Sequence, residues 1–197
     1  MKLLHISDTH GLHRRLQDLP EADIIVHSGD LSEDGTEDEI LDFLEWFIDL
    51  PYKYKIFVAG NHDLGLYGAN IEGLPENCFH LSNSGVTIEG VKFYGVPLFM
   101  EDIKTGIFDD NIRKIPADTD VLITHQPPPG ILDLSGNANF GDRTLLETVL
   151  KVQPKFHLFG HAHDAYGIEK IDHTTFVNGA LLDAHCEMAY KPILLEI

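Results

Sequence analysis

The chain has 197 residues, of which 43% are hydrophobic and 23% charged, a balance typical of a globular protein. Its 32 acidic residues outnumber 14 Lys and Arg, and a net charge of -18 repels nucleic-acid phosphates, so we expect no polynucleotide partner. No apolar run is long enough for a membrane span or a signal-peptide core, and Cys78 and Cys186 lack zinc or disulfide spacing. We therefore expect a single domain over residues 1–197, located in the cytoplasm, without membrane contact and with no protein partner predicted.

Short apolar runs rich in Ile, Val, Leu and Phe predict buried strands along the whole chain. In chain order they read KLLHIS, DIIVHS, KIFVAG, VTIEGVKFYGVPLF, DVLITH, KFHLFGH, TTFVNG and PILLEI. Within the fourth run, Glu89 and Gly90 separate two short strand patterns. That pair predicts a β-hairpin.

Two helical patterns lie between these runs. The first begins at Thr36, which forms a capping box with Glu39, and it ends before Pro51. The second runs from about Asp142 to Val152. Strands that alternate with helices, followed by strands joined by short turns, predict an α/β fold with two sheets covered by helices.

Polar side chains follow five of the predicted strands directly, and each is suited to bind a metal or move a proton. They are Asp8 and His10, then Asp30, then Asn61, His62 and Asp63, then His125, and finally His161 and His163. In α/β sheets the loops beyond the carboxyl ends of the strands form the ligand crevice. We therefore expect the five clusters to converge at one place.

Without His62 and Asp63, these clusters supply two aspartates, one asparagine and four histidines. Such a set exceeds the four ligands of a typical zinc site and suits two ions that share one carboxylate. Asp30 stands alone at its strand end and is the natural bridge. The imidazole content suits Mn, Fe, Co, Ni or Zn better than Mg or Ca. We expect two divalent transition-metal ions and favour manganese.

The motifs D-x-H, G-D, G-N-H-D, T-H and G-H-x-H, in this order from Asp8 to His163, resemble those of the calcineurin-like metallophosphoesterase superfamily. FVAGNHD, LITHQPPPGILDL and KVQPKFHLFGHAHDAYG look like the metallophosphoesterase-domain-containing branch related to the mammalian brain 239 proteins. The resemblance implies a four-layer α/β/β/α sandwich of two mixed β-sheets flanked by helices, with the active site at the C-terminal ends of the strands.

The resemblance also implies a role for each cluster residue. One metal would be held by Asp8, His10, Asp30 and His163, and the other by Asp30, Asn61, His125 and His161. A hydroxide that bridges the metals would attack phosphorus in line, while His62 acts as the acid at the leaving oxygen. Some members of the branch carry Gly in place of His161, so its presence here implies an intact two-metal centre.

Four further residues lie near the predicted ligands. Glu33 stands where the family often has an acid that orients the catalytic histidine. Arg143 is the best candidate for a supporting substrate contact, and it equally fits a surface position at a helix start. Asp63 can cap the next turn, hold His62 or touch substrate. We expect Asp164 to be an ordinary turn residue.

The remaining histidines have no partner motif. His5 and His27 lie inside strand patterns, where we expect them to form local hydrogen bonds. A structural or solvated role is expected for His13, His80, His157, His173 and His185.

The acidic composition and the lack of a basic groove favour a phosphoesterase that acts on a small phosphoester, and the resemblance implies a phosphodiester such as a cyclic nucleotide. A phosphomonoesterase of small phosphorylated metabolites stays open, as does a non-catalytic metal-binding scaffold like the retromer-subunit branch of this fold. His62 favours the enzyme, because a scaffold has no reason to keep it beside a complete ligand set. A serine hydrolase has no support, since the chain has no G-x-S-x-G turn.

Overall fold

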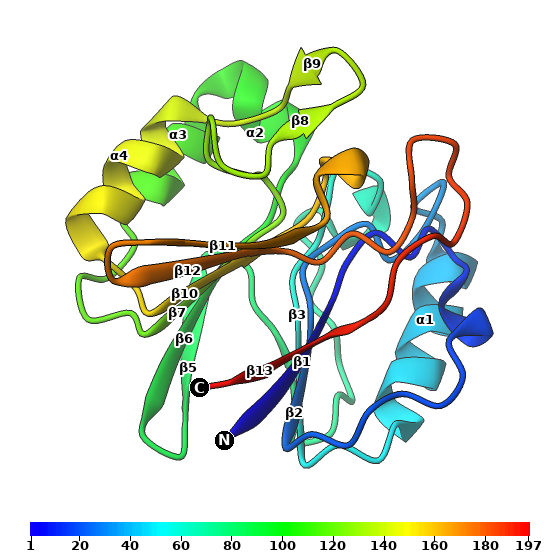
Figure 1. The fold of residues 1–197 in the computed structure, drawn as a ribbon. Coiled ribbons are helices and arrows are strands. Elements are labelled where there is room, and N and C mark those ends of the chain that lie inside the picture. Colours follow the sequence, from blue (N-terminus) through cyan, green and yellow to red (C-terminus); the bar gives the residue numbers. More distant parts are fainter.

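Two β-sheets pack against each other in the computed structural model, which describes residues 1–197 (Figure 1). The first has the strand order β13 (Ile193–Glu196), β1 (Lys2–Ile6), β2 (Ile24–His27), β3 (Tyr54–Phe57), β4 (Cys78–His80). The second has the order β11 (Gly167–Ile171), β12 (Thr174–Asn178), β10 (Phe156–Phe159), β7 (Val121–Thr124), β6 (Val91–Val96), β5 (Ser84–Ile88). Both sheets are mixed, because β13, β5 and β11 each pair antiparallel with a neighbour whereas the inner pairs are parallel.

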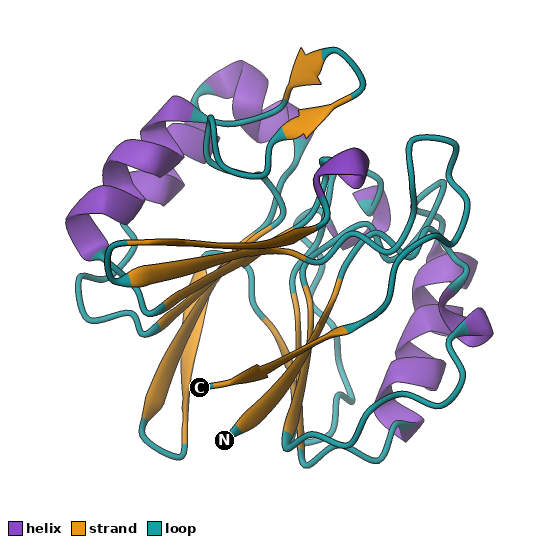
Figure 2. Ribbon diagram, viewed as in Figure 1, coloured by secondary structure: helices purple, strands orange, loops and turns teal.

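Helices cover the outer face of each sheet (Figures 1 and 2). Helix α1 (Glu37–Asp49) lies on the first sheet, and α2 (Met100–Thr105), α3 (Ile107–Arg113) and α4 (Arg143–Val152) lie on the second. A small hairpin of β8 (Leu134–Ser135) and β9 (Ala138–Asn139) and three 3-10 turns, η1 (His13–Arg15), η2 (Leu64–Leu66) and η3 (His163–Ala165), complete the chain. The predicted four-layer α/β/β/α sandwich is thereby confirmed.

Three apolar clusters separate the four layers. One cluster lies between the sheets, and it includes Leu3 and Val26 of the first sheet together with Ile123 and Leu158 of the second. The alternate residues of β1 point the other way, so Leu4 packs in the cluster that includes the stripe of α1. Strands buried on both faces read as continuous apolar runs, which explains why the sequence shows them so clearly.

The local predictions agree with the elements that form. Thr36 caps α1, since its side chain accepts a hydrogen bond from the Glu39 amide at 3.4 Å while Glu39 accepts one from the Thr36 amide at 3.1 Å. The hairpin at Glu89 and Gly90 joins β5 to β6. Asp142 caps α4 through the Leu145 amide at 2.7 Å. The longest helix, α1, has 13 residues, and no helix could span a bilayer.

Candidate metal centre

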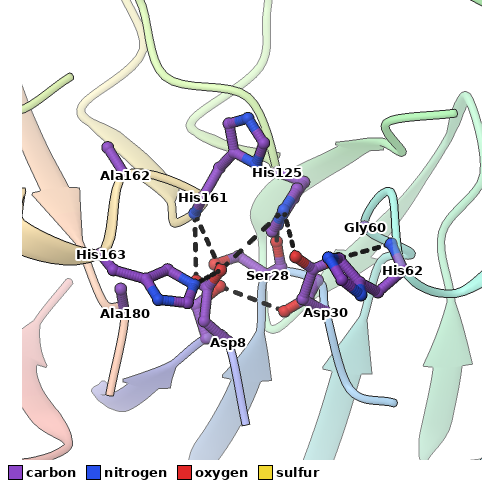
Figure 3. Close-up of polar contacts among 12 residues, drawn as sticks. Asp8, Ser28, Asp30, Gly60, His62, His125, His161, Ala162, His163 and Ala180 are labelled. Atoms are coloured by element: carbon purple, nitrogen blue, oxygen red, sulfur yellow. Dashed lines mark hydrogen bonds and ion pairs between the residues drawn. The ribbon is translucent and has the colours of Figure 1, made fainter. Parts of the chain in front are cut away.

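The C-terminal ends of β1, β2, β3, β7 and β10 meet where the two sheets converge, and the loops that follow them carry the predicted site residues. Three overlapping groups form there, and within each group the metal-binding atoms lie within 4.8 Å of one another. The groups are Asp8, His10 and His163; His10, Asp30 and His62; and Asp30, His125 and His161. The structure thus brings together residues separated by more than 150 positions in the chain (Figure 3).

The backbone at these positions is unusual. Asp8, Asp30 and His161 have φ values of 53°, 53° and 67°, in the left-handed region that residues other than glycine seldom adopt. Such conformations persist where surrounding structure imposes them, and they concentrate at functional sites. Gly60 and Gly160 leave room for the carboxylates, because a Cβ at either position would collide with Asp30 or Asp8.

Backbone amides then hold both carboxylates in place. The amide of His161 donates to both oxygens of Asp8 at 3.1 Å. The amide of His62 donates to Oδ1 of Asp30 at 2.9 Å (Figure 3). Each carboxylate is therefore oriented by the loop that carries a neighbouring member of the cluster.

Imidazole nitrogens approach these carboxylates at distances suited to a shared cation. Nε2 of His163 lies 3.3 Å from Oδ1 of Asp8, and Nε2 of His10 lies 3.6 Å from Oδ2 of Asp30. On the other side, Nε2 of His125 lies 3.1 Å from the same Oδ2 of Asp30. Asp30 consequently takes part in both halves of the cluster, as a bridging ligand would.

Several buried polar atoms in the cluster lack a hydrogen-bond partner. They include Oδ1 of Asn61, and also Nε2 of His10 and Nε2 of His125, for which the carboxylate of Asp30 is an ion-pair neighbour without a formed hydrogen bond. A buried group without a partner costs about 1 to 3 kcal/mol, so native proteins rarely leave three together. Nitrogen and amide oxygen atoms of this kind are ordinary ligands of divalent transition metals. The residues present therefore fit two such ions.

The far sides of the histidine rings contact polar groups, as is usual for metal ligands. Nδ1 of His125 contacts the carbonyl oxygen of Ser28 at 3.0 Å, and Nδ1 of His163 contacts that of Asp183 at 3.0 Å. Nδ1 of His10 lies 3.0 Å from Oε2 of Glu33. These contacts direct Nε2 of all three rings toward the carboxylates.

The pKa values of the cluster show how strongly it demands positive charge. Burial would raise the pKa of Asp8 and Asp30, but the neighbouring histidines, His125 foremost, together outweigh burial and lower both pKa values. Burial would lower the pKa of His125, yet Asp30 and Asp8 raise it to about 9. Two buried carboxylates thus require either an imidazolium or a bound cation beside them.

His62 lies at the side of the cluster, with its ring 4.7 Å from that of His10. Its Nδ1 contacts the backbone carbonyl oxygen of Glu33 at 2.7 Å. Glu33 stands where the family often has an acid that orients the catalytic histidine, but in the structure its backbone carbonyl contacts His62 while its carboxylate contacts His10. The reason is that the loop of His62 packs along the backbone of residues 33–35, where the amide of Gly65 also donates to the carbonyl of Gly35.

Asp63 has a role that the sequence analysis missed. It is fully buried, and it accepts hydrogen bonds from the amides of Gly60 and Ser32 at 2.8 and 3.0 Å and from the hydroxyl of Ser32 at 2.6 Å. Burial, with Asp30 nearby, raises its pKa to about 6. Asp63 therefore joins the loop of Asp30 to the loop of His62, and the expectations that it caps a turn or holds the His62 side chain are wrong.

Arg143 lies outside the cluster, whereas Asp164 forms hydrogen bonds with two other loops. Arg143 begins α4 with its side chain 89% exposed, and its Nε pairs with Oε1 of Glu147 at 3.1 Å, outside the cluster. Asp164 is not an ordinary turn residue, because its carboxylate accepts hydrogen bonds from the amides of Gly136 at 2.9 Å and Ala184 at 3.2 Å.

Three buried histidines, His5, His27 and His157, each contact a hydroxyl within two residues of a predicted ligand. Nε2 of His27 contacts Oγ1 of Thr9 at 3.0 Å, between Asp8 and His10 in the chain. His5 contacts Oγ of Ser28 at 2.8 Å, and His157 contacts Oγ1 of Thr124 at 2.9 Å. The expected hydrogen bonds of His5 and His27 are confirmed. Nothing in the sequence predicted their partners, Ser28 and Thr9, which lie in the loops that follow the neighbouring strands β2 and β1.

Comparisons with known proteins give a consistent result. A family model described as calcineurin-like phosphoesterase matches residues 1–165. A UPF0046 protein of Caenorhabditis elegans is 34% identical, over 100% of this chain and 75% of its own length. Metallophosphoesterase domain-containing protein 1 of Homo sapiens is 32% identical, over 98% of this chain and 69% of its own.

Two further matches are more distant. A 3',5'-cyclic-nucleotide phosphodiesterase of Nostoc is 28% identical, over 78% of this chain and 60% of its own. One solved crystal structure has the same fold, with a TM-score of 0.67 and 18% identity over 99% of this chain and 98% of that one. Together the matches confirm the resemblance that the order of the five motifs predicted.

Proposed function

Because this chain belongs to the calcineurin-like phosphoesterase family, we propose that it is a dinuclear metal-dependent phosphodiesterase that hydrolyses small phosphodiesters such as cyclic nucleotides. The observation that carries the proposal is the position of Asp30, whose carboxylate lies 3.6 Å from Nε2 of His10 and 3.1 Å from Nε2 of His125. Two divalent ions, which we propose to be manganese, would supply Lewis acidity to the phosphoryl oxygens.

His62 is the proposed acid. The carbonyl oxygen of Glu33 accepts a hydrogen bond from its Nδ1, which leaves Nε2 free for chemistry. The ring borders the group that contains His10 and Asp30, so it stands beside the place where phosphorus would bind. A protonated Nε2 can donate to the leaving oxygen, and such a contribution is typically worth about 100-fold to 10,000-fold in rate.

Charge at the centre supports a diester over a monoester. The ion-pair partners of Asp8 and Asp30 are all histidines, and Arg143 and Arg14 pair with Glu147 and Asp42 outside the cluster. The side chain of Glu33 is 53% exposed and adds a negative charge at the rim. A phosphomonoester carries close to two negative charges at neutral pH and a diester only one. The name of the Nostoc relative is in line with a diester.

The test compares bis(4-nitrophenyl) phosphate with 4-nitrophenyl phosphate on protein loaded with Mn²⁺. We expect metal-dependent turnover with a preference for the diester. His62→Ala should lower kcat at least about 100-fold while the protein retains its metal, as elemental analysis would measure. His173→Ala, in the exposed turn between β11 and β12, is the matched control and should leave kcat unchanged.

Three results would contradict the proposal in different ways. Absence of metal-dependent turnover with both substrates would leave a metal-binding scaffold. A preference for 4-nitrophenyl phosphate would make the protein a phosphomonoesterase. Loss of bound metal in His62→Ala would place this residue among the ligands instead of at the leaving group.

A further inference from the structure

His161 differs from the other histidines of the cluster in what holds its ring. The rings of His62, His125 and His163 each contact a backbone carbonyl oxygen, and the ring of His10 lies beside Glu33. The ring of His161 has neither a hydrogen bond nor an ion-pair partner, and in Figure 3 only its backbone nitrogen is joined by dashed lines. Metal-binding histidines are normally oriented by a polar partner on the far nitrogen.

An aromatic contact takes the place of that partner. The ring of Phe140 meets the ring of His161 edge to face, with the centroids 4.9 Å apart and the planes at 88°. The His125 ring also lies near, with its centroid 5.0 Å from that of His161 and the planes at 66°. Edge-to-face pairs of aromatic rings attract each other beyond the effect of the area they bury. Phe140 is the contact that restricts His161 from outside the cluster.

Phe140 belongs to the loop that carries the β8–β9 hairpin, and the base of this loop is firmly held. The amide of Phe140 donates to the carbonyl of Asp133 at 2.9 Å, and the amide of Gly141 donates to the carboxylate of Asp133 at 3.2 Å. The side-chain amide of Gln126, the residue after His125, donates to the carbonyl of Phe140.

The tip of the hairpin returns to the turn that contains His161. Oδ2 of Asp164 accepts hydrogen bonds from the amide of Gly136 at 2.9 Å and from the hydroxyl of Ser135 at 3.3 Å. Its other oxygen accepts one from the amide of Ala184 at 3.2 Å. The turn therefore holds the hairpin through Asp164, and the hairpin in turn packs Phe140 on His161.

We propose that Phe140 is a positioning residue for His161 and that Asp164 holds the hairpin that places it. The inference rests on the two-metal centre proposed above. Its consequence is that the ion held by Asp30, Asn61, His125 and His161 depends on Phe140, whose ring contacts His161, whereas the ion held by Asp8, His10, Asp30 and His163 has no ligand whose ring contacts Phe140. The two ions should then respond differently to changes in residues 134–140.

The test measures Mn²⁺ binding by titration calorimetry on metal-free protein, without substrate. Wild type should bind two ions. Phe140→Ala should lower the affinity of one site about tenfold and leave the other unchanged. Phe140→Tyr keeps the ring and should restore an affinity within about twofold of wild type, as aromatic packing requires.

Asp164→Asn tests the hairpin contact in a protein that is expected to fold, because the residue is exposed and the change keeps its size. Loss of one acceptor oxygen should weaken the site of His161 by about threefold, less than Phe140→Ala, since the base of the loop stays held. The amide of Gly136 should exchange hydrogen faster in this variant. Because Asp164 also follows His163, the site-specific comparison is made with the Phe140 variants. Asp172→Asn, in the exposed β11–β12 turn, is the matched control and should bind both ions like wild type.

Wild-type affinity at both sites in Phe140→Ala and Asp164→Asn would overturn the inference. An equal loss at both sites in Phe140→Ala would overturn it too, because it would indicate general loosening of the fold. If wild type itself binds only one ion, the two-metal centre fails, and the inference fails with it. Absence of phosphodiesterase activity alone would count only against the proposed function, since the binding measurements do not depend on turnover.

Discussion

Replacing His157 by Gln should remove part of the protein's sensitivity to acid. His157 lies in β10 with no exposed surface, and its Nε2 contacts Oγ1 of Thr124, the residue before His125. Burial lowers its pKa from 6.5 to about 3. Since the charged form is disfavoured only in the folded protein, the unfolded chain binds more protons than the folded one below pH 6.5. The free energy of unfolding therefore decreases as the pH is lowered below 6.5. Above that pH both states are neutral and the effect vanishes.

The size of the effect follows from the two pKa values. At pH 5 the imidazole is about 1.5 pH units below its pKa in the unfolded chain but still above its pKa in the folded protein. Each unit below the unfolded pKa stabilises the unfolded state by about 1.4 kcal/mol. His157 therefore removes about 2 kcal/mol of stability between pH 8 and pH 5. That amount is a substantial fraction of the roughly 5 to 15 kcal/mol by which domains are stable.

The assay is urea unfolding of metal-free wild type and His157→Gln at pH 8 and pH 5. Gln is uncharged at both values, so the free energy of unfolding should fall by about 2 kcal/mol less in the variant than in wild type. Comparing the two pH values cancels whatever the substitution costs through packing. The reasoning is refuted if the difference between the two proteins is the same at pH 5 as at pH 8.

Two further predictions concern the core and the centre. Phe47→Ala, at a fully buried position of α1, should lower the free energy of unfolding by about 3 to 5 kcal/mol, whereas Leu41→Ala, 55% exposed on the same helix, should change it by less than about 1 kcal/mol. Equal effects in urea unfolding would mean that α1 does not bury the stripe containing Phe47. Glu33→Gln should raise the Mn²⁺ concentration needed for half-maximal activity and leave kcat at saturating metal within about threefold of wild type, because the carbonyl of Glu33, not its carboxylate, contacts His62. A fall in kcat as large as that of His62→Ala would contradict this assignment.

Much of the architecture was visible in the sequence because its inner strands are buried on both faces. Short elements were missed, and the cause is their length. Helices α2 and α3 have six and seven residues and are separated by Gly106, so neither is long enough to show a helical period. Strand β11, GIEKI, is an edge strand whose three central residues are exposed, and it lacks the apolar run that marked the others.

The supporting contacts of the centre were harder to predict than its ligands. Asp63 looked like a capping residue because it begins a turn, yet its partners Leu31 and Ser32 lie more than 30 residues away. Asp164 was expected to be an ordinary turn residue, yet it accepts a hydrogen bond from Gly136, which is 28 residues away on another loop. The sequence around an acceptor side chain does not indicate which distant amide will donate a hydrogen bond to it.

By itself the sequence determined which residues could meet at the centre, because side chains that directly follow parallel strands are carried to one edge of a sheet. The order of Asp8, Asp30, Asn61, His125 and His161 after five apolar runs was sufficient for that. Only the tertiary structure decided what orients them, whether a carbonyl for His125, a carboxylate for His10 or an aromatic ring for His161. The physical reason is that strand periodicity is a local property, whereas the partner of each ring depends on how loops distant in the chain pack together.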